Sequence, residues 1–323
     1  MDTQRLGTAI AFLTGLLLSG LAASQDYPTR TVRIITSTPG NFHDIVARRI
    51  ALSLSEKWHQ PMIVENRGGA GATLAATAAA KAAADGYTLL VSDRTGLTVS
   101  PVLYRNLAYD PFKDLAPITL LGAAPMLLVA HASVPAATLG EFIAYLRRSK
   151  NPVDFASAGP GTAPHLLGEL LKQSARVELV NVHYKGSPAA MMGLLAGETK
   201  AAFMLVPVGL PHVRAGRVRA YATSGRQRFP GALDIPTVAE LGMPELESDL
   251  WLALMAPAHT PAPIIDKVNR EVVEILKTPA MRDTLIAQGA GVAYSTPAEL
   301  TSLMRSETAK WKKVIEIAGV RID

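Results

Sequence analysis

A glycine-rich turn between a strand and a helix is the part of this sequence with the clearest chemical use. An apolar strand ends near Ser157, residues 158–162 (AGPGT) form the turn, and a helical pattern begins at Ala163. Glycine lets a ligand approach the backbone closely, and threonine is a common N-cap residue. A turn of this kind directs free N–H groups and the positive end of a helix dipole at one point. Residues 157–162 are therefore a candidate anion site, although a single such turn is also common in ordinary strand-to-helix connections.

Four other loops share this composition. They are residues 37–43 (STPGNFH), 66–71 (NRGGAG), 93–98 (DRTGLT) and 185–188 (KGSP). Together they are rich in Gly, Ser, Thr and Asn, and Asp93 is the one carboxylate among them. In the last loop, Ser followed by Pro is typical of an N-cap and the first position of a helix. Because ligands of open α/β sheets bind beyond the carboxyl ends of the strands, we expect these loops to converge on one cleft that suits a small anion such as a carboxylate.

Alternating strand and helix patterns predict an α/β fold that positions these loops. In the N-terminal part, strands are expected at 31–36, 61–65 and 87–92, and helices at 44–58 and 72–84. A second series follows, with helices at 138–149, from 163, from 187 and at 208–215, and with strands from 153 and at 178–183, 200–204 and 217–223. The C-terminal part is expected to hold a short helix at 236–242, a strand at 249–257, and helices at 261–277, 279–288 and 297–317. Successive strand–helix units argue for a parallel sheet with helices on both faces.

Two segments are expected to cross between two lobes. The apolar runs 115–121 and 126–131 are separated by a Gly-Ala-Ala-Pro stretch, and the strand at 249–257 brings the chain back. We therefore predict a lobe 1 made of residues 25–124 and 250–323, and a lobe 2 made of residues 125–249. Two α/β lobes joined by crossing segments form a hinge architecture.

The N-terminus, residues 1–24, is expected to be a secretory signal peptide. Arg5 gives a positive start, residues 6–18 are nearly all apolar, and small residues follow. This pattern is typical of a signal peptide, with cleavage after Ala23 or Ser24. A membrane anchor is the alternative, but the apolar run is short for a spanning helix. The sequence thus predicts an exported, periplasmic protein.

Composition and charge exclude several classes of chemistry. The chain has 323 residues, no cysteine and a net charge of +5. Without cysteine there are no disulfides, no thiolate catalysis, no thiolate metal site and no lipoprotein anchor, so stability has to come from the core, which roughly 300 residues can supply. The positive residues are spread along the chain and do not alternate with aromatic ones, so nucleic acid is not expected as a partner. We predict a monomer without cofactor or metal.

Motifs along nearly the whole mature length carry a family resemblance. They are Tyr27-Pro28 with Val32-Arg33-Ile34-Ile35, Val64-Glu65-Asn66-Arg67 with Gly69-Ala70-Gly71, Asp85-Gly86-Tyr87-Thr88-Leu89, Tyr109-Asp110-Pro111, Ala156-Ser157-Ala158-Gly159 with Gly161-Thr162 and His165-Leu166, Tyr184-Lys185-Gly186-Ser187, and Pro236-Thr237-Val238-Ala239-Glu240. Together they resemble the Bug family of periplasmic receptors, the extracytoplasmic solute-binding proteins linked to tripartite tricarboxylate transporters. The resemblance implies a two-lobed, periplasmic-binding-protein-like fold (Venus flytrap, type II). It also implies a small carboxylate ligand, which is a di- or tricarboxylate, an amino acid or an aromatic acid, and which is delivered to membrane transporter subunits or reported to a sensor kinase.

The resemblance also implies where ligand contacts lie. Members of the family hold a carboxylate through the loop after the first strand and through the glycine loop, partly by way of bridging waters. The contacts implied here are near Thr38, Asn41, His43, Asp44, Ser157, Gly161, Thr162, Tyr184 and Ser187, and the same turns add Gly40, Ala158 and His165. Asp44 and His165 also have a structural explanation, since polar and acidic residues are common in the first turn of a helix.

Two departures from the family pattern bear on the ligand. Family members usually carry a Pro-Gly-Gly-Gly-Thr-Asp type of loop after the first strand, whereas residues 39–44 read PGNFHD, one residue shorter. Phe42 and His43 add bulk and a cationic group there. The usual Phe-Asp-Asn stretch is Phe-Met-Leu at 203–205, so two polar positions near the expected cleft become apolar. Both changes favour a less polar carboxylate, aromatic or branched.

Enzymes and adhesive proteins are the alternatives to a receptor. Residues 69–74 (GAGATL) follow a strand and open a helix as in dinucleotide-binding proteins, with Asp93 beyond the next strand, but Leu74 occupies the third glycine position. An exported protein also has little access to NAD. A hydrolase is not favoured, because the chain contains neither G-x-S-x-G nor H-E-x-x-H, and no histidine has an obvious carboxylate partner by spacing. The sequence thus leaves an exported α/β enzyme acting on a small anion, or a structural role, as the weaker alternatives.

Overall fold

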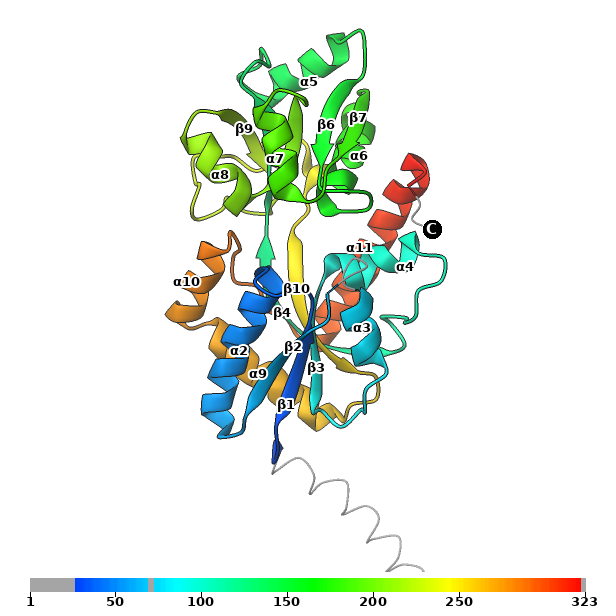
Figure 1. Ribbon diagram of the computed structural model, residues 1–323, viewed down its shortest axis with the longest axis vertical. Helices are drawn as coiled ribbons and strands as arrows, with labels where there is room; N and C mark the ends of the chain where they lie inside the picture. Colours follow the sequence, from blue (N-terminus) through cyan, green and yellow to red (C-terminus); the bar gives the residue numbers. More distant parts are fainter. Residues whose placement is uncertain (1–26, 69–72, 321–323) are drawn as a thin grey trace, which may run out of the picture.

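A computed structural model of the protein describes residues 27–68 and 73–320, and it shows two α/β lobes arranged along the long axis (Figure 1). Each lobe is built around a five-stranded sheet. The predicted two-lobed α/β fold is therefore confirmed. The predicted signal peptide and residues 69–71 of the second predicted loop lie outside the described residues.

The sheet of lobe 1 has the strand order β2-β1-β3-β10-β4. Its strands are β1 (Val32–Thr36), β2 (Met62–Asn66), β3 (Thr88–Asp93), β4 (Leu115–Ala124) and β10 (Leu250–Pro257), and the helices around it are α2 (Phe42–Trp58), α3 (Thr73–Ala80), α4 (Ser100–Leu103), α9 (Ala262–Leu276) and α10 (Pro279–Ala287). β1 pairs in parallel with β2 and β3, whereas β10 runs antiparallel to β3 and β4. Apolar strand residues such as Ile34, Val91 and Leu254 form a buried core with α2 and α9. This packing fixes the point at which β1 and β3 end.

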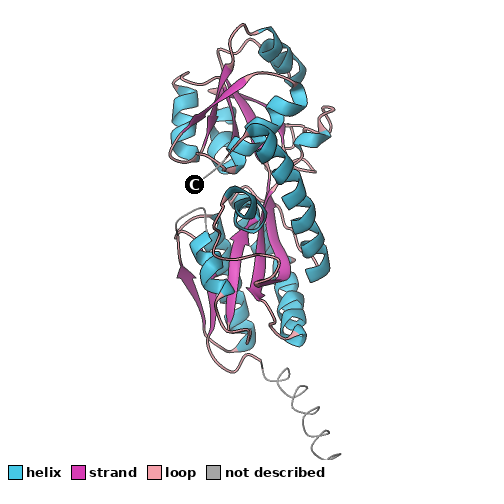
Figure 2. Ribbon diagram, turned by 90° about the vertical axis from the view of Figure 1, so that its right-hand side faces the viewer, coloured by secondary structure: helices cyan, strands magenta, loops and turns pink. Residues whose placement is uncertain are grey.

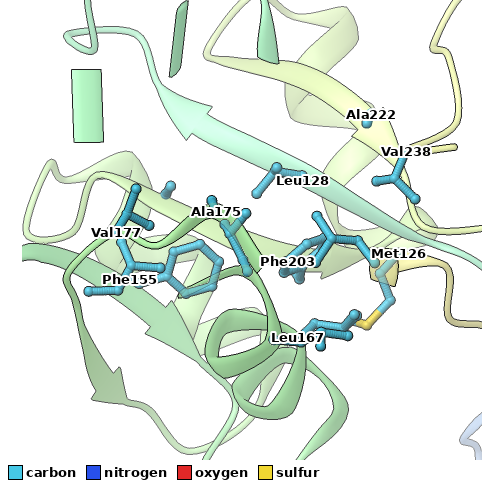
Figure 3. Close-up of a cluster of buried hydrophobic side chains, with 14 of the residues drawn as sticks. Met126, Leu128, Phe155, Leu167, Ala175, Val177, Phe203, Ala222 and Val238 are labelled. Carbon is cyan, nitrogen blue, oxygen red and sulfur yellow. The ribbon is translucent and has the colours of Figure 1, made fainter. Parts of the chain in front are cut away.

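The sheet of lobe 2 has the strand order β7-β6-β8-β5-β9. Its strands are β5 (Met126–His131), β6 (Val153–Ser157), β7 (Leu179–His183), β8 (Ala201–Leu205) and β9 (Val218–Thr223), and its helices are α5 (Leu139–Arg148), α6 (Ala163–Ala175), α7 (Ser187–Leu195) and α8 (Val206–Arg214). β6 pairs in parallel with β7 and β8, and β5 runs antiparallel to β8 and β9. Phe155 and Phe203 lie with ring centroids 6.0 Å apart in a core that includes Leu167 of α6 (Figure 3). The packing of Leu167 in this core holds α6 against the sheet.

The two sheets follow the same topological pattern. In each lobe the first parallel strand (β1 or β6) lies between the second and third strands, and an antiparallel strand from the crossing region (β10 or β5) lies next to the third strand. The turn from β1 to α2, residues 37–41, is therefore equivalent to the turn from β6 to α6, residues 158–162. Both turns have the same length and leave the carboxyl end of a parallel strand, which is where α/β sheets bind ligands.

A long C-terminal helix connects the lobes in addition to the two expected crossings. β4 leads directly into β5, and the chain returns through residues 248–249 into β10. Helix α11 (Pro297–Ala318) then runs from lobe 1 to lobe 2 (Figures 1 and 2). Its residues Leu300 and Met304 belong to a core cluster of lobe 1, and Trp311 belongs to the core cluster that contains the lobe 2 residues. In the predicted division into lobes this helix belongs wholly to lobe 1, and the predicted domain boundaries stay a prediction.

A buried arginine lies where these segments meet. Arg94 follows β3 directly and is 1% exposed. Its guanidinium donates a hydrogen bond to the Ser248 hydroxyl and lies 4.5 Å from the centre of the Trp311 ring. A carboxylate oxygen of Glu307 is 4.0 Å away. One cation thus links β3, the return crossing and α11, so a change in the angle between the lobes has to act on this cluster.

Three predicted elements differ in the structure. The segment 236–242 forms turns instead of a helix, because its backbone is bonded to the edge of β9: Thr223 donates to the carbonyl of Pro236, and Val238 donates to that of Thr223. α3 ends at Ala80, well before the predicted end at 84. Within the predicted loop 93–98, the residues from Thr95 onward form a π-helical turn, Thr95–Val99. Turns of this type often occur at functional sites.

Candidate ligand-binding cleft

A cleft of about 410 Å³ lies between the lobes, where the two equivalent turns face each other. Lobe 1 lines it with Ser37, Thr38, Asn41, His43, Asp93, Thr95 and Leu250, and lobe 2 lines it with Met126, Ala158, Thr162, Ala163, Pro164, Ser187 and Leu205. A larger groove of about 780 Å³ lies between α4 and α11, away from these loops. Of the two, only the interlobe cleft lies where β1, β3 and β6 end and where α2, α6 and α7 begin.

The lobe 1 turn is held by an acid in the first turn of α2. Gly40 has a φ of +73°, a conformation that glycine adopts without strain, and its N–H donates to Oδ2 of Asp44 at 2.9 Å. The N-cap side chain of Asn41 accepts a hydrogen bond from the Asp44 amide at 3.0 Å. Asn66 at the end of β2 donates to Oδ1 of Asp44 at 2.8 Å. Hydrogen bonds to both oxygens of the Asp44 carboxylate therefore hold the turn in place.

Asp44 is buried and ionised. Burial acts to raise the pKa of its carboxyl, but hydrogen bonds from Arg48, Gly40 and Asn66 outweigh burial and hold the pKa below its usual value. Arg48 Nε lies 3.0 Å from Oδ2, so the negative charge is compensated within lobe 1. Asp44 does not line the cleft.

A histidine–aspartate pair forms the lobe 1 wall of the cleft. His43 Nε2 lies 3.1 Å from Oδ2 of Asp93, and each side chain is 11% exposed. Oδ1 of Asp93 accepts a hydrogen bond from the Gly96 amide at 2.9 Å. Burial acts to raise the pKa of Asp93, but the charge of His43 and these hydrogen bonds outweigh it, so that the pKa lies below its usual value. The two residues come together because β1 and β3 are adjacent in the sheet.

The lobe 2 turn uses a neutral group where lobe 1 uses an acid. Gly161 has a φ of +71°, and its N–H donates to Nδ1 of His165 at 2.9 Å. The N-cap residue Thr162 makes no side-chain bond to the helix; its hydroxyl donates to the carbonyl of Gly159 at 2.7 Å. The same turn geometry is thus stabilised without a carboxylate.

A second histidine extends this arrangement. His183 at the end of β7 lies with its Nδ1 2.6 Å from Oγ of Ser157, and its ring packs edge-on against that of His165, with centroids 4.7 Å apart. Burial, followed by the charge of His183, lowers the pKa of His165 to about 4. Ser157 is 0% exposed, so its hydroxyl is not part of the cleft surface in this structure. Both histidines serve to hold the glycine turn.

Helix N-termini supply the hydrogen-bond donors that remain for a ligand. Within the described residues, the first amides of α2 (Phe42), α6 (Ala163) and α7 (Ser187) donate to no backbone carbonyl. Pro164 and Pro188 at the second position of α6 and α7 have no N–H at all. Unpaired amides at a helix N-terminus, together with the helix dipole, bind anions. The cleft can therefore hold an anionic group without any lysine or arginine.

The structure divides the predicted site residues into two groups. Six line the cleft, namely Thr38, Asn41, His43, Ala158, Thr162 and Ser187. The other six are not part of the lining, namely Gly40, Asp44, Ser157, Gly161, His165 and Tyr184. The Tyr184 hydroxyl donates a hydrogen bond to Oε2 of Glu198 at 2.8 Å, and the Tyr184 ring packs over Gly193, away from the lining. A ligand role for any of the twelve stays a prediction.

Several lining residues were not predicted individually. Met126 and Leu250 come from the crossing segments, whose apolar patterns indicate only strands. Of the two apolar replacements seen in the sequence, Leu205 lines the cleft, whereas Met204 is 1% exposed in the core of lobe 2. Phe42 packs against the core of lobe 1 and is absent from the lining. The change in cleft polarity therefore rests on Leu205.

The described part of the chain holds neither a metal-ligand cluster nor a helix suited to crossing a membrane. Between residues 27–68 and 73–320, no group of three or more His, Asp or Glu side chains is placed to hold a metal ion. Over the same ranges, no helix combines the length and the apolar character needed to cross a bilayer. The geometry is that of a binding cleft between two lobes.

Two lobes with the same strand order, joined by crossing strands around a cleft lined by helix N-termini, define the class of two-lobed solute-binding proteins. The sequence profile of the tripartite tricarboxylate transporter family receptor (TctC) matches residues 46–320, and the chain belongs to this family. The resemblance to Bug receptors drawn from the sequence motifs is thereby confirmed.

Individual relatives match the chain over nine-tenths of its length or more. BugT of Bordetella pertussis is 34% identical over 327 residues, which cover 100% of both chains. A Rhodopseudomonas palustris protein, Rpa4515, solved with adipate is 31% identical, with a TM-score of 0.77 and coverage of 91% of this chain and 99% of that one. MatC from the same organism, solved with bound malate, is 33% identical, with a TM-score of 0.73 and coverage of 90% of this chain and 100% of that one.

Proposed function

We propose that this protein is a periplasmic receptor that captures a small carboxylate between its lobes. The observation that carries the proposal is the convergence of the N-termini of α2, α6 and α7 on one cleft, through Asn41, Thr162 and Ser187. Helix N-termini attract carboxylates through their unpaired amides and dipoles. The relatives solved with adipate and malate support the same ligand chemistry.

Capture works by closing the lobes and involves no bond making or breaking. A ligand that touches both walls binds the closed form more tightly than the open form and so shifts the population toward closure. The buried cluster around Arg94 and the bridging helix α11 lie at the point where that motion has to bend the molecule. The closed form is what a partner recognises.

The proposal extends to location and partners. The signal peptide predicted at residues 1–24 would export the chain to the periplasm, where it works as a monomer. Membership in a transporter receptor family favours delivery of the ligand to membrane transporter subunits, and a sensor kinase is the second possible recipient. No cofactor is required for either role.

Calorimetric titration of the mature protein tests the proposal. The protein is unfolded and refolded to remove any carried ligand, and carboxylates of different size and charge are then titrated. A ligand at 100 times its dissociation constant should also raise the free energy of unfolding by about 2.7 kcal/mol. The proposal is wrong if no carboxylate binds.

A cleft-filling variant tests the location of binding. Ser187 lines the cleft at the first position of α7, so Ser187→Trp should abolish binding while leaving the protein folded. Ser302 lies exposed on α11, outside the cleft, and Ser302→Trp is the matched control that should bind as the wild type does. Equal affinity in the two variants would place the ligand elsewhere.

A further inference from the structure

Charge is unequally divided between the two walls of the cleft. Among the described lining residues, His43 is the only one that can carry a positive charge, and Asp93 is the only carboxylate. They lie 3.1 Å apart, so the charge of His43 is already compensated. Residues 69–72, outside the described part, are Gly and Ala and bring no charge. A second carboxylate on a ligand would therefore find no uncompensated cation on the lobe 1 wall and would face Asp93.

The wall that lobe 2 contributes to the cleft differs in charge from that of lobe 1. Its lining residues carry no charge of either sign, and α6 and α7 both begin there. The amides of Ala163 and Ser187 have no backbone acceptor within the described residues. The histidine that fixes the glycine turn, His165, accepts a hydrogen bond as a neutral ring, so no carboxylate competes with a ligand for the dipole of α6. An anionic group is better stabilised on this wall.

The rest of the lining is largely apolar. Met126, Leu205 and Leu250 come from three different strands and surround the space between the two turns. Ala163 and Pro164 add carbon surface at the start of α6. Covering this apolar surface with a ligand's hydrocarbon lowers the free energy of the complex, because both surfaces leave water. An unpaired carboxylate placed there loses its hydration, which raises the free energy.

We infer that the ligand carries a single carboxylate, held by the N-termini of α6 and α7 in lobe 2, and an apolar body that lies against Met126, Leu205 and Leu250. The inference rests on the proposed function and narrows its ligand class to monocarboxylates with an aliphatic or aromatic body. Leu205 is the residue that determines this specificity.

Matched pairs of carboxylates test the inference. Hexanoate and adipate have the same carbon chain and differ by one carboxylate, and benzoate and terephthalate form the equivalent aromatic pair. Calorimetric titrations of the wild type, stripped of carried ligand, measure the dissociation constants. Within a pair of which either member binds, the dissociation constant of the monocarboxylate should be at least about ten times lower than that of the dicarboxylate, because burying an unpaired carboxylate costs free energy. Equal or tighter binding of the dicarboxylate overturns the inference but leaves a carboxylate receptor. If no carboxylate binds, the proposed function fails and the inference with it.

A substitution at Leu205 sharpens the test. Leu205→Asn places an amide on the cleft wall, so it should weaken monocarboxylate binding. The ratio of the dicarboxylate's dissociation constant to that of the monocarboxylate should fall at least about threefold. Leu241 is 41% exposed and outside the cleft, and Leu241→Asn should leave the ratio unchanged. Thermal unfolding of the free variants shows whether both remain folded. An unchanged ratio in folded Leu205→Asn overturns its role as the specificity residue.

Discussion

The turn after β1 and the turn after β6 have the same backbone geometry, but different side chains hold them in place. Both place a glycine with positive φ (Gly40 or Gly161) before the N-cap, and in both the glycine amide donates to the side chain at the third helical position. That side chain is the carboxylate of Asp44 in lobe 1 and the imidazole of His165 in lobe 2. The geometry is the same, and the charge is not.

The difference assigns separate tasks to the two lobes. In lobe 1, the Asp44 carboxylate takes hydrogen bonds from Gly40, Asn66 and Arg48, so the dipole of α2 is already engaged by an internal anion. In lobe 2, a neutral His165 fixes the turn and leaves the dipole of α6 to an external anion. Lobe 1 therefore provides a rigid wall, and lobe 2 provides the anion seat.

The largest effect is expected from removing the internal anion. Asp44→Ala should lower the free energy of unfolding by about 3 kcal/mol, because Gly40 and Asn66 lose the charged acceptor of their hydrogen bonds and the first turn of α2 loses its carboxylate. Urea denaturation measures the change. Asp266 is exposed on α9, and Asp266→Ala is the matched control, with an expected change within about 0.5 kcal/mol. A loss for Asp44→Ala as small as that of the control would show that the lobe 1 turn does not depend on its carboxylate.

A pH dependence is the next effect in size, and it should belong to lobe 2. Burial lowers the pKa of His165 to about 4, from 6.5 in the absence of that environment. Between these values the unfolded chain binds a proton at this position that the folded chain does not, so His165 lowers the free energy of unfolding as the pH drops from 6.5 to about 4. Burial raises the pKa of Asp249 to about 6, so this carboxyl opposes the effect of His165 over part of the same interval. The pKa of Asp44 is held below its usual value, so its contribution to stability is lost as the pH falls toward and below that usual value.

His165→Asn separates this effect from the general acid sensitivity of the protein. Asparagine can still accept the hydrogen bond from Gly161 but does not titrate, so the variant should lose less stability over the same pH interval. His183 faces His165 and remains in both proteins, which makes the difference between them specific to His165. Parallel urea denaturation curves at pH 7, 5.5 and 4.5 measure it. The same slope in the variant and the wild type would contradict the assignment.

The smallest effect concerns the two N-caps. Asn41 bonds to an amide of its helix, whereas Thr162 bonds only to the carbonyl of Gly159 within the turn. Asn41→Ala should therefore cost about 1 kcal/mol of unfolding free energy, the usual value of an N-cap. Thr162→Ala should cost about 0.5 kcal/mol, the low end for one hydrogen bond. Thermal or urea unfolding of the pair checks the order, and a reversed order would contradict the different roles of the two caps.

Much of the fold follows from local sequence signals. β-branched and apolar runs predict the strands, and the glycine turns predict where β1 and β6 give way to helices. The segment 236–242 was mispredicted because its amides bond to β9, a tertiary partner that local pattern does not reveal. The bridging role of α11 was missed for the same reason, since the burial of Trp311 in lobe 2 depends on how the lobes sit together.

The candidate site was predictable as a set of loops but not as a set of contacts. Composition identifies the turns, but the hydrogen bonds that occupy Gly40, Gly161 and the Thr162 hydroxyl depend on side-chain geometry. The pairing of His43 with Asp93 had a usable signal, because in this strand order β1 and β3 are neighbours and their ends meet.

A crystal structure with the tightest-binding carboxylate would show which lobe holds the anion. We expect the carboxylate oxygens to lie about 3 Å from the amide nitrogens of Ala163 and Ser187, a normal hydrogen-bond distance. The hydrocarbon should then lie toward Leu205. A carboxylate bound instead against the first turn of α2, beside Asp44, or outside the interlobe cleft would contradict this expectation.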